Sequence, residues 1–133
     1  VKLGKKEGGD FWQVEKSLPK KGNFFAPCYF VDQSGSSTIS REEVFGPVLS
    51  ISTFRTPEEA ITKANDTNYG LAAGIWSEKG SKVHKVAGGL RAGVIWANTY
   101  NKFDATSPFG GFKESGYGRE GGRHGLLPYV EVV

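Results

Sequence analysis

The stretch Glu42-Glu43-Val44-Phe45-Gly46-Pro47-Val48 stands directly before the most regular strand pattern in the chain. Gly46 gives the backbone freedom, and Pro47 fixes its own φ and disfavours a helical conformation at Gly46. The sequence therefore predicts a sharp turn that leads into a strand. The carboxylate of Glu43 can accept hydrogen bonds from hydroxyl groups. The ring of Phe45 can stack on a flat heterocycle. The alternative interpretation is a solvated acidic pair beside an aromatic residue of the core.

Strand and helix patterns alternate after this turn. Residues 48–54 alternate as a strand does, and Thr56-Pro57-Glu58-Glu59 combines a cap, a proline in the first turn and a capping-box glutamate. A short apolar strand over 71–76, a helix over 79–88 and a strand over 93–98 follow. This order predicts right-handed crossovers onto one largely parallel sheet, and hence the α/β class.

The two ends of the chain have weaker patterns. Residues 1–31 predict an N-terminal β segment with loops, in which the apolar run 24–31, interrupted by a proline, fits an edge or bent strand. Residues 33–40 predict a polar surface loop, and 118–126 a short helix. Residues 129–133 predict a terminal strand whose edge needs another chain to cover it.

Two aromatic residues lie in a loop rich in glycine and proline that follows the last predicted crossover strand. They are Phe103 and Phe109. Because loops at the carboxyl ends of parallel strands build the ligand crevice of such sheets, both rings are candidates for lining a pocket. The alternative is that they plug the end of the sheet.

Length and composition exclude several classes of protein. At 133 residues the chain is one ordinary domain or a piece of a larger one. A single cysteine excludes an internal disulfide and a zinc cluster of thiolates, and it favours a reducing, cytoplasmic location. The sequence contains no run of 18 or more apolar residues, so no membrane span is expected.

The net charge of +3 has one source. Residues 1–22 hold six lysines against three acidic residues, and the other 11 basic residues are balanced by 11 acidic ones. A nucleic-acid binder is therefore disfavoured, because no basic face extends through the rest of the chain. A salt titration of binding to single-stranded DNA would test this alternative.

The remaining reactive side chains predict no catalytic or metal centre. Cys28 has neither a base nor a helix N-terminus beside it in the sequence, so a structural role is favoured over a nucleophilic one. His84 has no partner at metal-ligand spacing and is interpreted as a surface residue.

Three long motifs together resemble the aldehyde dehydrogenase superfamily. They are the stretch 42–48, Asn-Asp-Thr-Asn-Tyr-Gly-Leu over 65–71, and Ser-Pro-Phe-Gly-Gly-Phe-Lys-Glu-Ser-Gly over 107–116. They occur in the order of that family, and the Gly-Arg-Glu-Gly-Gly of 118–122 fits the family's tail. The resemblance covers residues 22–133.

The resemblance implies a role for each candidate residue. Glu43 matches the glutamate that accepts hydrogen bonds from the nicotinamide ribose, and Phe45 matches the aromatic residue beside the nicotinamide ring. Phe103 and Phe109 match positions that wall the aldehyde pocket. The implied full-length enzyme oxidises an aldehyde to a carboxylic acid through a thioester, with NAD or NADP as cofactor. Neither the aldehyde nor the choice of cofactor follows from this sequence.

The resemblance also implies a division of the chain. Residues 1–126 match the C-terminal portion of the catalytic domain. Residues 127–133 match the start of the oligomerisation strand, which pairs with a neighbouring subunit of a homo-oligomer.

The family's nucleophile, general base, oxyanion-hole asparagine and Rossmann portion belong to sequence that precedes these motifs. Cys28 lies only 15 residues before Glu43, too close to match the nucleophile. No catalytic residue is therefore expected in this chain, which is expected to be inactive alone. The alternative is a catalytically inactive module that binds a full-length partner, which size-exclusion chromatography with a homologue would reveal.

Overall fold

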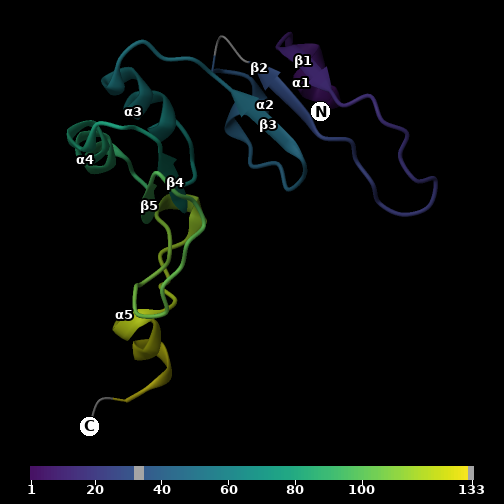
Figure 1. Ribbon diagram of the computed structural model, residues 1–133. Coiled ribbons are helices and arrows are strands. Elements are labelled where there is room, and N and C mark those ends of the chain that lie inside the picture. Colours follow the sequence, from purple (N-terminus) through teal and green to yellow (C-terminus); the bar gives the residue numbers. More distant parts are fainter. Residues whose placement is uncertain (32–34, 132–133) are drawn as a thin grey trace. The chain divides into compact units, whose positions relative to one another are not determined.

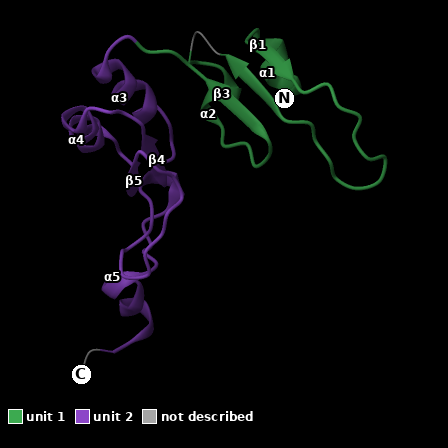
Figure 2. Ribbon diagram, in the orientation of Figure 1, with its two compact units in different colours: residues 1–54 green, residues 55–133 purple. Residues whose placement is uncertain are grey.

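The computed structural model describes residues 1–31 and 35–131. By contacts the chain divides into two compact units, Val1–Phe54 and Arg55–Val133 (Figure 2). The first unit contains these elements (Figure 1): α1 Lys2–Glu7, β1 Asp10–Gln13, β2 Cys28–Val31, α2 Thr38–Arg41 and β3 Val48–Ile51. The second contains α3 Pro57–Asn65, β4 Ala72–Ile75, α4 Gly80–Gly89, β5 Val94–Ala97, α5 Gly122–Leu126 and the 3₁₀ helices η1 Lys113–Ser115 and η2 Leu127–Tyr129.

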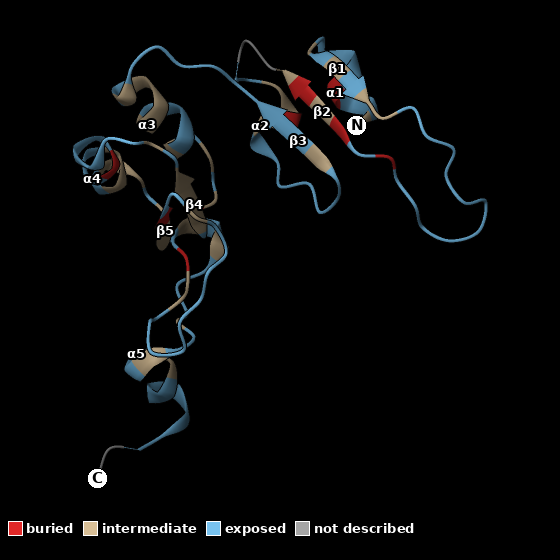
Figure 3. Ribbon diagram, viewed as in Figure 1, coloured by how far each residue is buried: buried red, intermediate tan, exposed pale blue. Residues whose placement is uncertain are grey.

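The first unit is built on a three-stranded sheet with β2 at its centre. β2 pairs antiparallel with β1 and parallel with β3, so that Phe30 lies opposite Phe11 on one side and Ser50 on the other. β2 is also the most buried strand of this unit (Figure 3). Pro27 directly precedes β2, so the missing N–H of the proline removes no hydrogen bond from the ladder.

The core of the first unit forms around Phe30, whose side chain is fully buried. Cys28 and Ile39 are buried beside it, and the ring of Phe11 lies 4.9 Å from the Phe30 ring. A Cβ on Gly4 would lie 3.1 Å from the Phe30 ring, so α1 packs closely against this residue. Glycine at this position allows the close approach.

The second unit contains the strand–helix–strand crossover expected from the sequence. β4 and β5 pair in parallel, with Ala72 opposite Val94, and α4 connects them. α3 starts as predicted, because the Thr56 hydroxyl accepts a hydrogen bond from the N–H of Glu59. The Glu59 carboxylate in turn accepts one from the N–H of Arg55 at 2.8 Å.

Asn98 ties together the carboxyl ends of the two strands. Its backbone has a positive φ of 53°, a conformation that asparagine tolerates better than most residues. Its side-chain Oδ1 accepts from the N–H of Ser77 at 2.9 Å, and its Nδ2 donates to the Ser77 carbonyl at 3.1 Å. The loops that leave β4 and β5 are therefore fixed where they begin.

The α/β class and the parallel pairing are confirmed, but the strand pairing differs from the single expected sheet. The hydrogen bonds of the described residues pair β3 with β2 and β4 with β5, in two sheets. Of the apolar run 24–31, expected as an edge or bent strand, only Cys28–Val31 forms β2. The edge alternative is wrong, since β3 pairs with the second side of β2.

Four local predictions also differ from the structure. Residues 2–7 form α1 where strands and loops were expected, and 38–41 form α2, which overlaps the end of the surface loop expected over 33–40. The helix expected over 118–126 is confined to α5. At the C-terminus, η2 occupies part of the expected strand, Val130 is extended, and residues 132–133 lie outside the described residues. The division at residue 126 and the pairing of 127–133 with another subunit stay predictions.

None of the helices within residues 1–31 and 35–131 has the length and apolar character needed to cross a membrane.

Candidate functional site

The segment that carries Glu43 and Phe45 is fixed by backbone hydrogen bonds at the start of β3. The N–H of Gly46 donates to Val44 at 2.9 Å, and the N–H of Val48 donates to Gly46 at 2.8 Å. The carbonyl of the intervening proline accepts from the N–H of Cys28 at 3.0 Å. The predicted turn into a strand is therefore confirmed, and the turn is anchored to the central strand of its unit.

Both candidate side chains of this segment are exposed within the first unit. The exposed fraction of Phe45 is 93 %, and Glu43 is also exposed. The alternative that Phe45 belongs to the core is therefore contradicted. Directly beside the segment lies a shallow, mostly apolar hollow of about 400 Å³, lined by Trp12, Pro27, Cys28, Tyr29, Gly46, Pro47, Val48 and Leu49.

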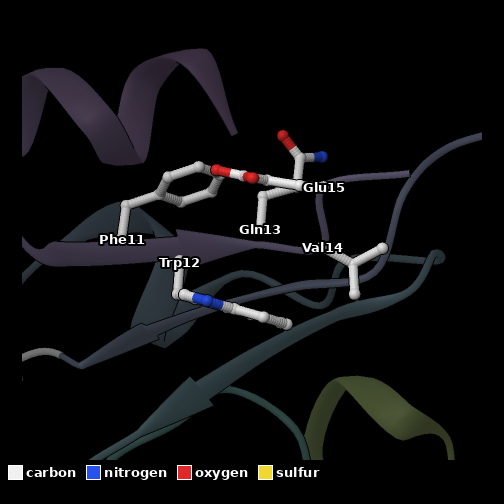
Figure 4. A pocket seen from close by; sticks show the side chains of 5 residues that line it. All are labelled: Phe11, Trp12, Gln13, Val14 and Glu15. Carbon is white, nitrogen blue, oxygen red and sulfur yellow. The ribbon is translucent and has the colours of Figure 1, made fainter. Parts of the chain in front are cut away.

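A second hollow of the first unit lies along β1 and the two residues after it. Phe11, Gln13 and Glu15 lie on one side of the strand, and Trp12 and Val14 lie on the other (Figure 4). The amide of Gln13 donates to the carbonyl of Ala26 at 3.1 Å. Glu15 is the one ionisable residue that lines this hollow, so the hollow offers no pair of groups for acid–base catalysis.

In the second unit, Phe103 and Phe109 contact each other although they lie six positions apart in the sequence. Their ring centroids lie 5.0 Å apart with an interplanar angle of 78°, an edge-to-face arrangement. Phe103 also meets the ring of Trp96 edge-on at 5.6 Å. Trp96 is buried at the end of β5, and its indole N–H donates to the carbonyl of Lys102 at 2.7 Å. The aromatic pair thus rests on a fixed residue of the sheet.

The two rings differ in exposure. The exposed fraction of Phe103 is 61 %, and Phe109 is half-buried. Phe103 touches the end of the sheet through Trp96, and much of the residue is exposed within its unit. That the two rings line a pocket stays a prediction.

The second and third family motifs contact each other. The Lys113 ammonium donates to the carbonyls of Asn65 at 3.0 Å and Thr67 at 2.8 Å, which lie at the C-terminal end of α3. The hydroxyl of Ser115 accepts from the N–H of Gly70 at 3.0 Å. Lys113 has a positive φ of 55°, a strained conformation for lysine. The sequence provided no signal for these contacts, because the partners are more than forty residues apart.

Asp104 is the acidic residue that directly follows Phe103. Two hydrogen bonds lower the pKa of the Asp104 carboxyl below its usual value. The one from the Thr106 hydroxyl has the larger effect, and the one from the Thr106 N–H, at 2.8 Å, the smaller. Asp104 is therefore ionised at neutral pH, so it is a poor candidate for a general acid.

The four candidate residues fall into two pairs. Glu43 and Phe45 lie in the unit 1–54, whereas Phe103 and Phe109 lie in the unit 55–133. That both pairs border one crevice stays a prediction. Across the part of the chain that the structure describes, no three His, Cys, Asp or Glu residues are grouped so that they could hold a metal ion. Cys28 is buried.

Comparison with known proteins gives one consistent result. A sequence model of the aldehyde dehydrogenase family matches residues 1–133. The chain is 45 % identical over 132 residues to the putative aldehyde dehydrogenase DhaS of Bacillus subtilis (strain 168), covering 99 % of this chain and 27 % of DhaS. It is 43 % identical to the mitochondrial aldehyde dehydrogenase of Sus scrofa, covering 99 % of this chain and 25 % of that enzyme.

Solved structures agree with the sequence relatives. An indole-3-acetaldehyde dehydrogenase of P. syringae, a mutant in complex with NAD⁺ and IAA, matches with a TM-score of 0.91 and 44 % identity over 98 % of this chain and 27 % of that chain. The NAD⁺ complex of an aldehyde dehydrogenase from Bacillus cereus matches with a TM-score of 0.88 and 45 % identity, over 98 % and 26 %. The chain thus spans about a quarter of the length of these relatives.

Proposed function

Because this chain belongs to the aldehyde dehydrogenase family, we propose that it works as the C-terminal portion of the catalytic domain of an NAD(P)-dependent aldehyde dehydrogenase. It contributes nicotinamide-ribose contacts and walls of the aldehyde pocket to an enzyme that oxidises an aldehyde to a carboxylic acid. The observation that carries the proposal is the match of 98 % of the chain to a quarter of an NAD⁺-bound relative with a TM-score of 0.91. The nucleophile and the base would come from the rest of the enzyme, so the 133 residues alone are expected to turn over no aldehyde.

The exposed segment at the start of β3 fits a nicotinamide nucleotide. The Glu43 carboxylate is exposed, and its oxygens can accept the hydrogen bonds that ribose hydroxyl groups donate. The Phe45 ring is almost fully exposed on a backbone that three hydrogen bonds hold in place, so one of its faces is free to stack. A nicotinamide held there would supply the hydride-acceptor chemistry of the proposed oxidation. Glu43 and Phe45 would hold and orient it.

Replacing Glu43 tests the cofactor part of this proposal. Glu43→Gln removes the charge that strengthens hydrogen bonds from the ribose, so the Kd for NADH is expected to rise about tenfold. Fluorescence titration of the full-length enzyme with NADH measures this Kd. Glu42→Gln is the matched control, since Glu42 is the adjacent exposed carboxylate. Equal effects of the two substitutions would contradict a specific role of Glu43.

Replacing Phe103 tests the aldehyde part. Phe103→Ala removes the edge-to-face partner of Phe109 and an apolar surface, so the KM of a ring-bearing aldehyde such as phenylacetaldehyde should rise about tenfold. The KM of acetaldehyde, which is too small to cover both rings, should change less than about twofold. Phe54→Ala is the control, because Phe54 has a matching exposed fraction of 60 % but lies in the other unit. An unchanged KM for phenylacetaldehyde would remove Phe103 from the pocket.

The C-terminal residues support a second part of the proposal, assembly into a homo-oligomer. Large apolar side chains of α5 and the segment after it are exposed: Leu126, Leu127, Tyr129 and Val130. An exposed apolar group of this kind is usual where another subunit binds. It also fits the second candidate, an inactive module that binds a full-length relative. Size-exclusion chromatography distinguishes the two candidates. A homo-oligomer forms from this protein alone, whereas an inactive module forms a complex only after mixing with the full-length relative.

A further inference from the structure

The loop that carries Phe103 and Phe109 forms no helix or strand before η1, so its conformation depends on the segment that contacts it. That segment is 118–122. The N–H of Phe109 donates to Glu120 and the N–H of Glu120 donates back to Phe109, both at 2.7 Å. The N–H of Gly122 donates to Ala105 at 2.9 Å. Both the N–H and the carbonyl of Phe109 are thus paired with Glu120, eleven positions further along the chain.

The two backbones approach so closely that only glycine fits between them. A Cβ on Gly110 would lie 2.0 Å from the carbonyl oxygen of Gly118, and one on Gly121 would lie 2.7 Å from that of Ser107. Glycine also makes the loop conformationally free, because Gly110 and Gly111 directly follow Phe109. An ordered Phe109 therefore needs a contact that restrains these two glycines.

Arg119 provides this contact. Its Nη1 donates to the carbonyl of Gly111 at 2.8 Å and to those of Tyr117 at 3.0 Å and Gly118 at 2.9 Å. Its guanidinium lies 5.2 Å from the centre of the Phe112 ring, within the range of a cation–π contact. Gly111 is buried, so losing the donor would leave a buried carbonyl with one fewer hydrogen bond.

We propose that Arg119 is a positioning residue for Phe109. It restrains the two glycines after Phe109 and thereby fixes the ring that forms the wall of the aldehyde pocket with Phe103. This inference rests on the proposed function for the identity of the pocket, whereas the restraint itself depends only on the contacts of Arg119. The consequence for catalysis is selective. A displaced Phe109 weakens the binding of aldehydes large enough to touch it and leaves small aldehydes nearly unaffected.

Two substitutions separate the hydrogen bonds of Arg119 from its bulk. Arg119→Met keeps an unbranched side chain but removes every donor. Arg119→Lys keeps a cation whose one nitrogen has three N–H donors, which suits a site where three carbonyls share a single nitrogen of the arginine. Arg123→Met is the matched control, since Arg123 is an exposed arginine of the neighbouring α5.

The test uses the full-length enzyme that contains this chain, and it combines hydrogen exchange with steady-state kinetics. In Arg119→Met, we expect hydrogen exchange of the Phe109 and Glu120 amides to accelerate about tenfold. We also expect KM for phenylacetaldehyde to rise about tenfold with kcat and acetaldehyde KM changed less than about twofold. Arg119→Lys should restore most of both effects, and Arg123→Met should resemble the wild type.

The outcomes distinguish this inference from the proposed function. Unchanged exchange in Arg119→Met, or a lysine variant no better than the methionine variant, overturns the role of Arg119 even if the enzyme is active. Equal loss for both aldehydes overturns it too, because a general structural defect lacks size selectivity. A full-length enzyme that contains this chain and oxidises no aldehyde would refute the proposed function, and the exchange measurement would still decide whether Arg119 restrains Phe109.

Discussion

Gly93→Ala is expected to destabilise the second unit strongly. A Cβ at this position would lie 1.7 Å from the carbonyl oxygen of Gly110 and 2.7 Å from its carbonyl carbon. Both are backbone atoms, and the loop they belong to is held by 118–122, so the clash has no flexible side chain to absorb it. The N–H of Gly93 also donates to the Gly70 carbonyl at 3.0 Å, which anchors the position from the other side. A loss of at least about 3 kcal/mol in the free energy of unfolding follows.

Gly88→Ala is the matched control for this substitution. Gly88 lies in α4, and apart from the adjacent residues and the backbone of its own helix no heavy atom lies within 4 Å of the position its Cβ would take. Alanine is the better helix former, so stability should stay the same or rise by up to about 1 kcal/mol. Thermal unfolding followed by circular dichroism measures both variants. Similar midpoints for the two alanine variants would show that the contact between Gly93 and Gly110 is not a constraint of the folded protein.

Phe30→Ala is expected to cost about 3–5 kcal/mol in the free energy of unfolding, the usual range for deleting a buried ring. Phe30 is the fully buried residue on which the first unit is assembled: its ring contacts Phe11, and α1 reaches it through Gly4. Deleting the ring removes its packing against Phe11 and leaves a cavity, which adds to the lost transfer free energy. Urea unfolding of the wild type and of Phe30→Ala measures the difference in their free energies of unfolding.

Phe45→Ala in the same unit separates folding from binding. With 93 % of Phe45 exposed, its removal should change the free energy of unfolding by no more than about 0.5 kcal/mol. The same variant should weaken NADH binding, because the ring is the proposed stacking surface. A Phe45 variant as destabilised as the Phe30 variant would place its ring in the interior and end the case for a cofactor contact.

The site could be predicted from the sequence only as far as residue type and neighbourhood. Glu43 and Phe45 were found because turn, carboxylate and ring are neighbours in the chain, and the structure confirms the turn and the exposure. The contact between Phe103 and Phe109 was not predictable, since it depends on Trp96 beneath them and on the segment 118–122. Lys113 and Arg119 were missed for the same reason: each donates to carbonyls, which carry no side-chain signature in the sequence.

The sequence by itself determined the α/β alternation, the crossover through α4 and the start of α3. Each of these depends on signals within a few residues, such as the Thr56 cap, whose hydrogen-bonding partner is three positions away. The tertiary structure alone decided which strands pair, why residues 2–7 form a helix against Phe30, and how the aromatic loop is held. Those outcomes depend on burial and on backbone hydrogen bonds between distant segments, which stabilise a conformation only once the segments have met.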